Sequence, residues 1–287
     1  MNADFGQVWS ATHARGSSSQ LEEWLGFAQA CCDVADEIAL RHFRRELDIE
    51  TKPDRTLVTA ADKQIEEVIR ARIAERFPDH GLVGEEFGET RGETTARWYI
   101  DPIDGTHNFI RGIPLFGTLL ALEVESEIQV GVMSAPALRE RWYASRGSGA
   151  WAVGAVGSEG SRPLHVSRMA AVEDAQLLYG SAADLEASGL APGFRPLLSS
   201  VWRDRGFGDF WGYALVAEGA AEGMIEVDVN TWDLAAAAVI IEEAGGRLTS
   251  FDGTRSIAGG TVLATNGLLH DEFRSRLGQG GAETRRP

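Results

Sequence analysis

The chain has 287 residues, of which 44% are hydrophobic, which is enough to bury a sizeable core in one large domain or two closely joined lobes. Its formal net charge of −16 argues against nucleic acid or an anionic membrane as a partner held by a general electrostatic field. Cys31 and Cys32 are its two cysteines, which argues against a disulfide framework or a cysteine metal site and favours buried thiols in a reducing cytoplasm.

The two ends of the chain are expected to be flexible tails, with one fold between them. Residues 1–20 include a glycine followed by three serines and lack the basic start and apolar centre of a signal peptide. Residues 278–287 are also expected to be flexible. Residues 21–277 are expected to form two α/β lobes in one compact unit, about 21–158 and 159–277. No uninterrupted apolar stretch is long enough to span a bilayer.

Helical patterns alternate with short apolar runs, which predicts a mixed fold of the α/β or α+β class. The expected helices, in chain order, cover residues 21–47, a stretch within 56–78 ended by Pro78, about 210–220, 231–244, and a last helix from about 268. The expected strands cover residues 81–84, 96–101, 116–125, 128–135, 141–145 and 261–265. Alternation around turns predicts an antiparallel meander for residues 117–145. The glycines of RGSGAW lack the spacing of a nucleotide-binding loop and favour a tight turn between strands.

The stretch WYIDPIDGTHNF places two aspartates three residues apart. Asp101 follows an apolar run, and Pro102 is expected to end that strand in a turn that brings Asp104 near Asp101. Two carboxylates this close repel each other unless a cation lies between them or one is protonated. The backbone amides of Gly105 and Thr106 begin a new segment and would suit an anion such as phosphate. An Asp-rich turn that caps a helix is the alternative for this stretch alone.

Three further stretches place carboxylates where predicted elements begin or end. Asp62 falls on the same face of its predicted helix as the apolar stripe. In LVGEEF a short apolar strand stops just before Glu85 and Glu86, one of which is expected to face the strand ends. Asp233 falls in the first turn of a helix so apolar that it should be buried. Taken singly, each has an ordinary explanation as a dipole-stabilising or solvated carboxylate.

If these carboxylates converge, they form an oxygen-rich site where active sites of α/β folds collect. The six histidines are scattered and no HExxH or CxxC motif is present, which argues against zinc. Oxygen ligands favour Mg²⁺ or Mn²⁺, and ions held in this way beside a helix N-terminus would suit a phosphate ester. A non-catalytic Mg²⁺ or Ca²⁺ protein is the alternative of another class, although a structural cage needs no hydroxyl such as that of Thr106.

The pieces VTAAD, GEE, WYIDPIDGTHNF and WDLAAA occur in the order, and at roughly the spacing, of the inositol monophosphatase family. From about residue 21 to about residue 277 the sequence resembles that family. The resemblance implies a layered αβαβα sandwich of the inositol monophosphatase and fructose-1,6-bisphosphatase type. It also implies a lithium-sensitive phosphatase that acts on a small phosphorylated metabolite. Such an enzyme would use two or three Mg²⁺ ions, which Mn²⁺ could replace. Members of the family are commonly homodimers.

Matching the motifs residue by residue, the resemblance implies a role for each carboxylate. The implied metal ligands are Glu85, Asp101, the backbone carbonyl of Ile103, Asp104, Asp233 and, near a third and weaker ion, Asp62. The implied catalytic residues are Thr106 and Glu85, which would position and activate the attacking water, and Asp62. Phosphate would bind at the Gly105 and Thr106 amides beside Asp104.

Substrate-side residues are also implied by the resemblance. Lys52 would lie near the site and Glu226 near the leaving alcohol. The stretch GDFWGY makes the chain most like the bacterial histidinol-phosphate phosphatases, in which case Asp209 and Glu226 could pair with a cationic alcohol and the aromatic rings could face its imidazole. The rings could equally be core residues of a helix. The alternative substrate is inositol 1-phosphate, whose hydroxyls Glu226 and Asp233 would bind; other sugar or nucleotide phosphates are more distant options.

Overall fold

The computed structural model describes residues 16–45, 49–51, 57–154, 160–258 and 260–279. Its helices are α1 (Ser18–His42), α2 (Ala60–Arg76), α3 (Thr106–Ile110), α4 (Ala182–Ser188), α5 (Phe194–Leu198), α6 (Asp209–Ala217), α7 (Thr231–Glu243) and α8 (His270–Gly278). Its strands are β1 (Ile49–Thr51), β2 (Leu57–Thr59), β3 (Gly81–Gly84), β4 (Gly88–Thr90), β5 (Arg97–Asp104), β6 (Gly117–Val124), β7 (Glu127–Ala135), β8 (Glu140–Ser145), β9 (Ala150–Val153), β10 (Arg162–Pro163), β11 (Gln176–Tyr179), β12 (Arg203–Arg205), β13 (Gly223–Val227), β14 (Arg247–Thr249) and β15 (Thr261–Thr265).

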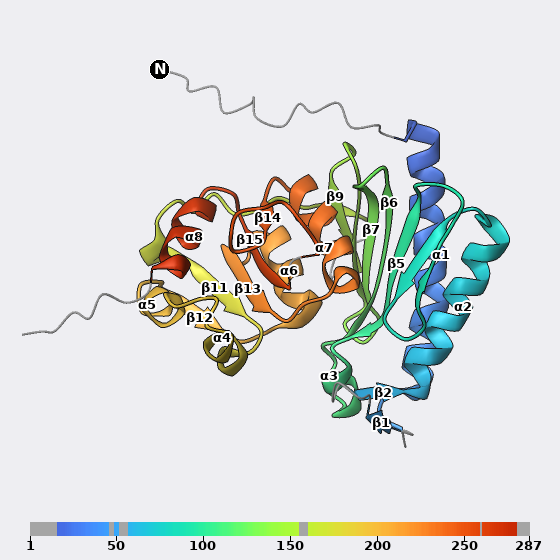
Figure 1. Ribbon diagram of the computed structural model, residues 1–287, viewed down its shortest axis with the longest axis horizontal. Helices are drawn as coiled ribbons and strands as arrows, with labels where there is room; N and C mark the ends of the chain where they lie inside the picture. The colour runs from blue at the N-terminus through green and yellow to red at the C-terminus, as the bar shows by residue number, and fades with distance from the viewer. Residues whose placement is uncertain (1–15, 46–48, 52–56, 155–159, 259, 280–287) are drawn as a thin grey trace, which may run out of the picture.

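Helical layers alternate with two sheets (Figure 1). The larger sheet has eight strands in the order β10-β9-β8-β7-β6-β5-β3-β4, and α1 and α2 pack on one of its faces. Helices α6 and α7 lie between this sheet and a second sheet of five strands, in the order β12-β11-β13-β15-β14. Helices α4, α5 and α8 lie beyond the smaller sheet, so the fold is the expected αβαβα sandwich.

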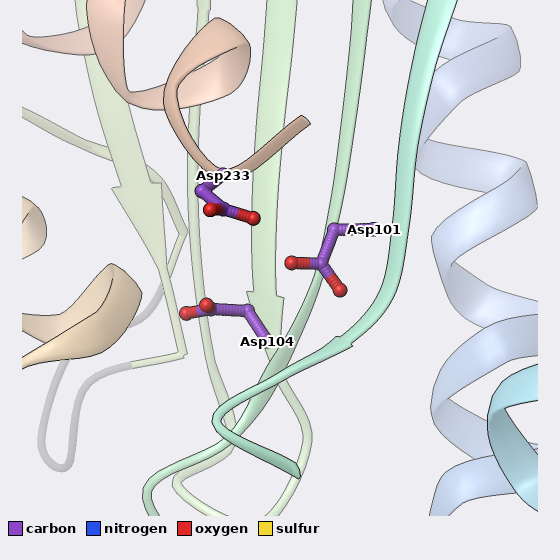
Figure 2. Close-up of side chains that lie close together, drawn as sticks. All are labelled: Asp101, Asp104 and Asp233. Atoms are coloured by element: carbon purple, nitrogen blue, oxygen red, sulfur yellow. The ribbon is translucent and has the colours of Figure 1, made fainter. Parts of the chain in front are cut away.

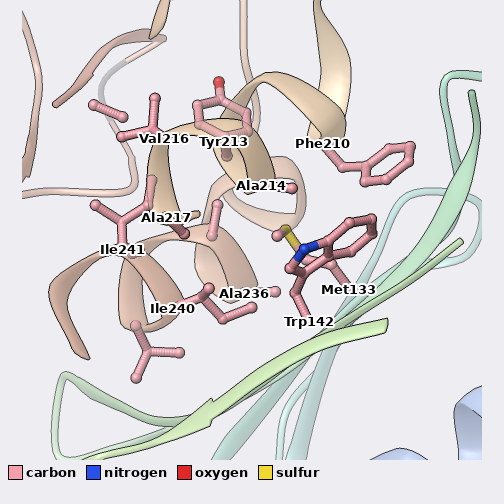
Figure 3. Packing of buried hydrophobic residues seen from close by; sticks show 14 of the residues in the cluster. Met133, Trp142, Phe210, Tyr213, Ala214, Val216, Ala217, Ala236, Ile240 and Ile241 are labelled. Atoms are coloured by element: carbon pink, nitrogen blue, oxygen red, sulfur yellow. The ribbon is translucent and has the colours of Figure 1, made fainter. Parts of the chain in front are cut away.

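Helix α7 is buried between the sheets, as its apolar sequence predicted. Eight successive residues, from Leu234 to Ile241, are buried. Small side chains allow the helix to approach the larger sheet closely: a Cβ at Gly131 would lie 2.9 Å from the backbone of Ala236. Around this contact the two layers interlock through a mixture of large and small side chains, including Met133 and Trp142 of the sheet (Figure 3). The burial fixes α7, and with it the N-terminal turn that carries Asp233.

Most strands and helices lie where the sequence predicted them. The run β6–β7–β8 is an antiparallel meander, and RGSGAW spans the turn between β8 and β9. Cys31 and Cys32 are both buried free thiols on α1. Among the described residues, no helix is long and apolar enough to cross a membrane.

Helix α1 differs from the prediction at both ends. It begins at Ser18 because Ser17 caps it, in a capping box with Gln20, so residues 18–20 are helical and do not belong to a tail. It ends at His42, five residues early, because Phe43 adopts an extended backbone with φ −59° and ψ 129°. Of the expected tails, residues 1–15 and 280–287 lie outside the described part of the chain.

Strand β5 does not end at Asp101, contrary to the prediction. It runs on through Pro102 to Asp104, where it pairs with Gly117 of β6. The pairing register shifts between Asp101 and Asp104, which marks an irregularity of the β-bulge type. Pro102 is tolerated because it falls within this irregular stretch, where it need not donate to the ladder. The motif is therefore a bulged strand rather than a strand followed by a turn.

Candidate active site

Three aspartates from two distant segments meet between the larger sheet and α7. A carboxylate oxygen from each of Asp101, Asp104 and Asp233 lies within 4.8 Å of the others. Figure 2 shows Asp101 and Asp104 on β5 facing Asp233, which projects from the start of α7. Asp101 is only 2% exposed, and the other two are partly buried. The predicted convergence of these three residues is confirmed.

The bulge in β5 brings Asp101 and Asp104 to one place. In a regular strand, residues three apart point to opposite faces, and the register shift between them removes that obstacle. Thr118 of β6 holds the bulge by donating its hydroxyl to the carbonyl of Pro102 at 2.8 Å. One oxygen of Asp104 also accepts a hydrogen bond from the backbone amide of Phe210 at the start of α6. The bulge, and not a proline turn, thus forms the pair.

Asp233 is held by the N-terminus of α7. The residue occupies the third helical position, and its Oδ2 accepts a hydrogen bond of 2.7 Å from the backbone amide of Asn230, the N-cap. This capping box satisfies a helix-terminal amide and directs the carboxylate toward β5. Asp233 therefore both stabilises the N-terminus of α7, as the ordinary explanation predicted, and joins Asp101 and Asp104 in the cluster.

Asp62 and Glu85 approach the same site. Asp62 is fully buried in the first turn of α2, and its Oδ2 accepts from the amide and the hydroxyl of Thr59, at 2.9 and 2.6 Å. Glu85 directly follows β3, which runs parallel to β5. Its amide donates to the carbonyl of Ile100 at 3.2 Å, which places Glu85 next to Asp101 at the shared end of the two strands.

Burial and the charges of neighbouring carboxylates raise the pKa values of the aspartates in the site. Burial, followed by the charge of Glu85, raises the pKa of Asp101 well above its usual range. Burial raises the pKa of Asp233 to about 7 and that of Asp62 to about 6, and the charge of Glu85 adds to both shifts. For Asp104, burial and then the charge of Asp209 raise the pKa. The fold thus gathers carboxyl groups that repel one another when ionised.

A divalent cation fits this arrangement. Asp62 Oδ1 and Asp101 Oδ1 are buried and have no hydrogen-bond partner within the described part of the chain. A buried carboxylate oxygen without a partner is expensive unless a cation or a proton satisfies it. All the donors are oxygens, which suits Mg²⁺ or Mn²⁺ and not zinc. The candidate ligands are thus Asp101, Asp104 and Asp233, with Glu85 and Asp62 beside them.

Gly105 and Thr106 form the start of α3, next to Asp104. Gly105 has φ +78°, a left-handed conformation, and a Cβ there would lie 2.8 Å from the carbonyl oxygen of Leu115. The Thr106 hydroxyl donates to the carbonyl of Ile103 at 2.9 Å. The hydroxyl that a catalytic role requires is therefore beside the carbonyl expected to bind metal. The roles of these residues toward water, metal and phosphate stay predictions.

Asp209 and Glu226 form a second acidic pair that adjoins Asp104. The backbone amide of Asp209 donates to Glu226 Oε1 at 3.2 Å, and the hydroxyl of Tyr213 donates to Glu226 Oε2. Asn108 of α3 donates from its side chain to Asp209 Oδ2 at 3.0 Å. Burial raises the pKa of Glu226 to about 8. Together these contacts connect the cation site to the start of α6.

Two of the three aromatic rings of GDFWGY are core residues, which leaves them unavailable as the ligand face that the sequence left open. Phe210 and Tyr213 are each 1% exposed and belong to the core between the sheets. Trp211 packs on that core with its ring 4.8 Å from the ring of Phe207. These two rings lie in the packed layer that α6 forms with α7 and the larger sheet, so the alternative of ordinary core residues is correct for them (Figure 3).

One predicted site residue cannot be placed, and three supporting residues were not predicted. Lys52 lies outside the described residues. Several supporting residues were missed: Thr59 holds Asp62, Asn108 holds Asp209, and Tyr213 holds Glu226. Thr59 could have been found as an N-cap three residues before an acidic N3 residue. The other two bonds join residues far apart in the chain or across an element boundary, which no local pattern indicates.

Comparisons with known proteins agree with the fold and the site. Residues 20–282 match the model of the inositol monophosphatase family. The chain is 46% identical to histidinol-phosphatase from Mycobacterium tuberculosis over 259 residues, which cover 89% of this chain and 98% of that relative. It is 42% identical to histidinol-phosphatase from Streptomyces coelicolor (89% and 97% covered) and 34% identical to a fructose-1,6-bisphosphatase/inositol-1-monophosphatase from Thermotoga maritima (80% and 86% covered).

Solved structures show the same architecture. An IMPase from Thermotoga maritima superposes with a TM-score of 0.79 at 31% sequence identity, covering 89% of this chain and 96% of that one. The extragenic suppressor protein suhB from Bartonella henselae gives a TM-score of 0.82 at 28% identity, covering 90% and 100%. The family match spans nearly the whole described fold and contains every carboxylate of the candidate site. The chain therefore belongs to the inositol monophosphatase family.

Proposed function

We propose that this protein hydrolyses histidinol phosphate to histidinol and phosphate, with Mg²⁺ or Mn²⁺ as cofactor. The observation that carries the proposal is the carboxylate cluster of Asp101, Asp104 and Asp233, with one oxygen of each within 4.8 Å of the others. Among the described residues, one oxygen of Asp101 and one of the neighbouring Asp62 have no hydrogen-bond partner. Membership of a phosphatase family and three relatives named histidinol-phosphatase, at 38–46% identity, support the reaction and the substrate.

The carboxylates would hold two or three cations close together. Asp101 would be shared between two ions, with Glu85 and the Ile103 carbonyl on one side and Asp104 and Asp233 on the other, while Asp62 would contribute to a third. When bound, Mg²⁺ would lower the pKa of a water molecule and neutralise charge on the phosphate and the departing oxygen. The residue pattern supports this assignment because all ligands are hard oxygens.

The protein groups would orient the reactants. Thr106 and Glu85 would hold the attacking water in line with phosphorus and accept its proton, and the amides of Gly105 and Thr106 would bind phosphate oxygens beside Asp104. The supporting observation is that the Thr106 hydroxyl lies at the start of α3, within hydrogen-bond distance of the Ile103 carbonyl. Lys52 would add a positive charge near the site.

Discrimination between substrates must come from contacts with the alcohol part of the ester, because every phosphate ester presents the same phosphate group to the cations. Asp209 and Glu226 would bind the ammonium or imidazolium of histidinol. Each carboxylate already has partners that hold it in place, since Asn108 donates to Asp209 and Tyr213 donates to Glu226. A cationic ligand there would favour the ionised carboxylate and lower the pKa of Glu226 from about 8.

Inositol 1-phosphate is the second candidate substrate. Relatives named inositol-1-monophosphatase or fructose-1,6-bisphosphatase/inositol-1-monophosphatase are 30–34% identical to this chain. In this case Glu226 and Asp233 would accept hydrogen bonds from ring hydroxyls.

We also expect, from the family resemblance, that the protein is a homodimer in the cytoplasm. Light scattering would test the dimer, and cell fractionation would test the location.

The test is kcat/KM for histidinol phosphate, inositol 1-phosphate and a small neutral ester, measured on the wild type, Asp209→Asn and Glu226→Gln. A charge-assisted hydrogen bond is worth about 1.5–3 kcal/mol, so each variant should reduce the preference for histidinol phosphate by about ten- to a hundredfold. Asp228→Asn, an exposed neighbour on the same segment, is the control and should keep the preference. Equal or better use of inositol 1-phosphate by the wild type would contradict the assignment.

A further inference from the structure

Glu66 is a buried carboxylate that no step of the proposed reaction uses. It lies on α2 one turn after Asp62, and its side chain is 0% exposed. Arg70, one further turn along, pairs with it at 2.7 Å from Nε to Oε1. Burying a charge in this way is expensive, so the carboxylate must be well satisfied to remain ionised. Its other partners indicate what it does.

Two of those partners directly follow Glu85, and the residue before Glu85 lies close to the same carboxylate. Glu66 Oε2 accepts from the backbone amide of Glu86 at 2.7 Å, and Oε1 accepts from the amide of Phe87 at 3.2 Å. On the other side, a Cβ at Gly84 would lie 2.0 Å from Glu66 Oε1, so glycine is needed for the strand end to approach the carboxylate. The backbone that carries Glu85 is thus held against α2 by one carboxylate.

Arg70 extends the same restraint further along the chain. Its guanidinium donates to the carbonyl of Gly88 and, at 3.2 Å, to the hydroxyl of Thr90, which lies in β4. The guanidinium therefore joins Glu66 to the hairpin that follows Glu85. As a result, α2 carries one carboxylate of the site, Asp62, and also holds the backbone of a second, Glu85.

We propose that Glu66 is a positioning residue that sets the place of Glu85 in the cation site, and that Arg70 holds it in that role. The inference rests on the proposed function, because it takes Glu85 to be a cation ligand. The physical basis is that a carboxylate can accept two backbone amides and a guanidinium at once, whereas a glutamine has one acceptor oxygen. Its amide nitrogen would face an N–H group, and the turn would loosen.

The effect should appear as weaker cation binding. Partners that orient metal ligands typically contribute ten- to a hundredfold in affinity. We therefore expect Glu66→Gln to raise the dissociation constant for Mn²⁺ by about ten- to a hundredfold. In phosphate release, the half-saturating Mg²⁺ concentration should rise to a similar extent, whereas kcat at saturating Mg²⁺ should change little.

The experiment titrates the full chain with Mn²⁺ and follows the free ion by electron paramagnetic resonance, without substrate. Wild type is compared with Glu66→Gln and with Glu67→Gln, which makes the same change at an exposed position one residue along α2. Glu67→Gln should bind Mn²⁺ like the wild type. Arg70→Lys keeps the positive charge but loses the forked donor, and it should weaken Mn²⁺ binding in the same direction.

The outcomes separate the inference from the proposed function. Unchanged Mn²⁺ affinity in folded Glu66→Gln, even with a lowered Tm, would overturn the positioning role and leave Glu66 a structural residue. If Glu66→Gln does not fold, unchanged affinity in Arg70→Lys would overturn the role instead. A wild type that binds no Mn²⁺ would overturn the cation site itself, and with it both proposals.

Discussion

The substitution Asp233→Asn tests whether the negative charge of Asp233, which the proposed site needs to bind cations, destabilises the folded protein when no cation is present. Without a cation, ionised Asp233 is opposed mainly by burial and by the charge of Glu85, which together raise its pKa from 3.8 to about 7. A carboxyl group with a raised pKa contributes stability below its unfolded pKa, and this contribution is lost as pH rises through the folded pKa. The cation-free protein should therefore lose stability between about pH 4 and pH 7.

The magnitude follows from the same shift. About three pKa units at ~1.4 kcal/mol each amount to about 4 kcal/mol at pH 8. Asparagine can still accept the Asn230 amide but loses its charge at the helix N-terminus, which costs about 1 kcal/mol. The variant should then be about 3 kcal/mol more stable than the wild type in the absence of cations, or about 6 °C in Tm for a chain of this size.

The assay is thermal unfolding at pH 5 and pH 8, in EDTA and in Mg²⁺. In EDTA, Asp233→Asn should melt above the wild type at pH 8, and the gap should narrow at pH 5, where the wild-type carboxyl is protonated. Mg²⁺ should raise Tm strongly for the wild type and weakly for the variant, which should also lose most phosphate release. Asp184→Asn, at the same third helical position of α4 but exposed, should show neither effect. A variant no more stable than the wild type in EDTA at pH 8 would show that ionised Asp233 does not destabilise the cation-free protein.

Three further predictions concern the same site. Asp104→Asn should lose most phosphate release while staying folded, as assayed with circular dichroism alongside turnover; near-normal turnover at saturating Mg²⁺ would remove it from the ligands. Thr106→Val should reduce kcat by about a hundredfold or more with Mn²⁺ affinity unchanged, and Thr106→Ser should recover most of it; equal rates for the two variants would argue against a role for the hydroxyl. Glu86→Gln should have a small effect on turnover, since the motif match selects Glu85; a loss as large as that of Glu85→Gln would reverse the two roles.

The sequence located the site because its carboxylates stand beside strong local signals. Asp233 lies in the first turn of a helix with no polar face, so burial between layers could be predicted from the pattern alone. Asp62 shares a face with an apolar stripe, and the structure buries it completely. Asp101 and Asp104 were correctly paired, although for the wrong local reason. Proline suggests a turn, but pairing with β6 continues the strand as a bulge, and such pairing depends on a segment distant in the chain.

Side-chain partners across elements could not be predicted in the same way. The bonds from the Glu86 and Phe87 amides to Glu66 span about twenty residues and depend on how α2 packs beside β3. Local patterns describe which face of a helix is buried but not which backbone amide meets it. The rings of Phe210 and Tyr213 illustrate the same point, because only the packing of α6 against α7 and the larger sheet turns them into the core.

If the carboxylate cluster holds the catalytic cations, phosphate release depends on them. The most direct measurement is phosphate release from histidinol phosphate in Mg²⁺, after transfer to excess EDTA, and after Mg²⁺ is added back. We expect turnover in Mg²⁺, none in EDTA, and recovery when Mg²⁺ is restored, because none of the carboxylates and hydroxyls described in the site can replace the cation in activating water. Undiminished hydrolysis in excess EDTA would contradict it.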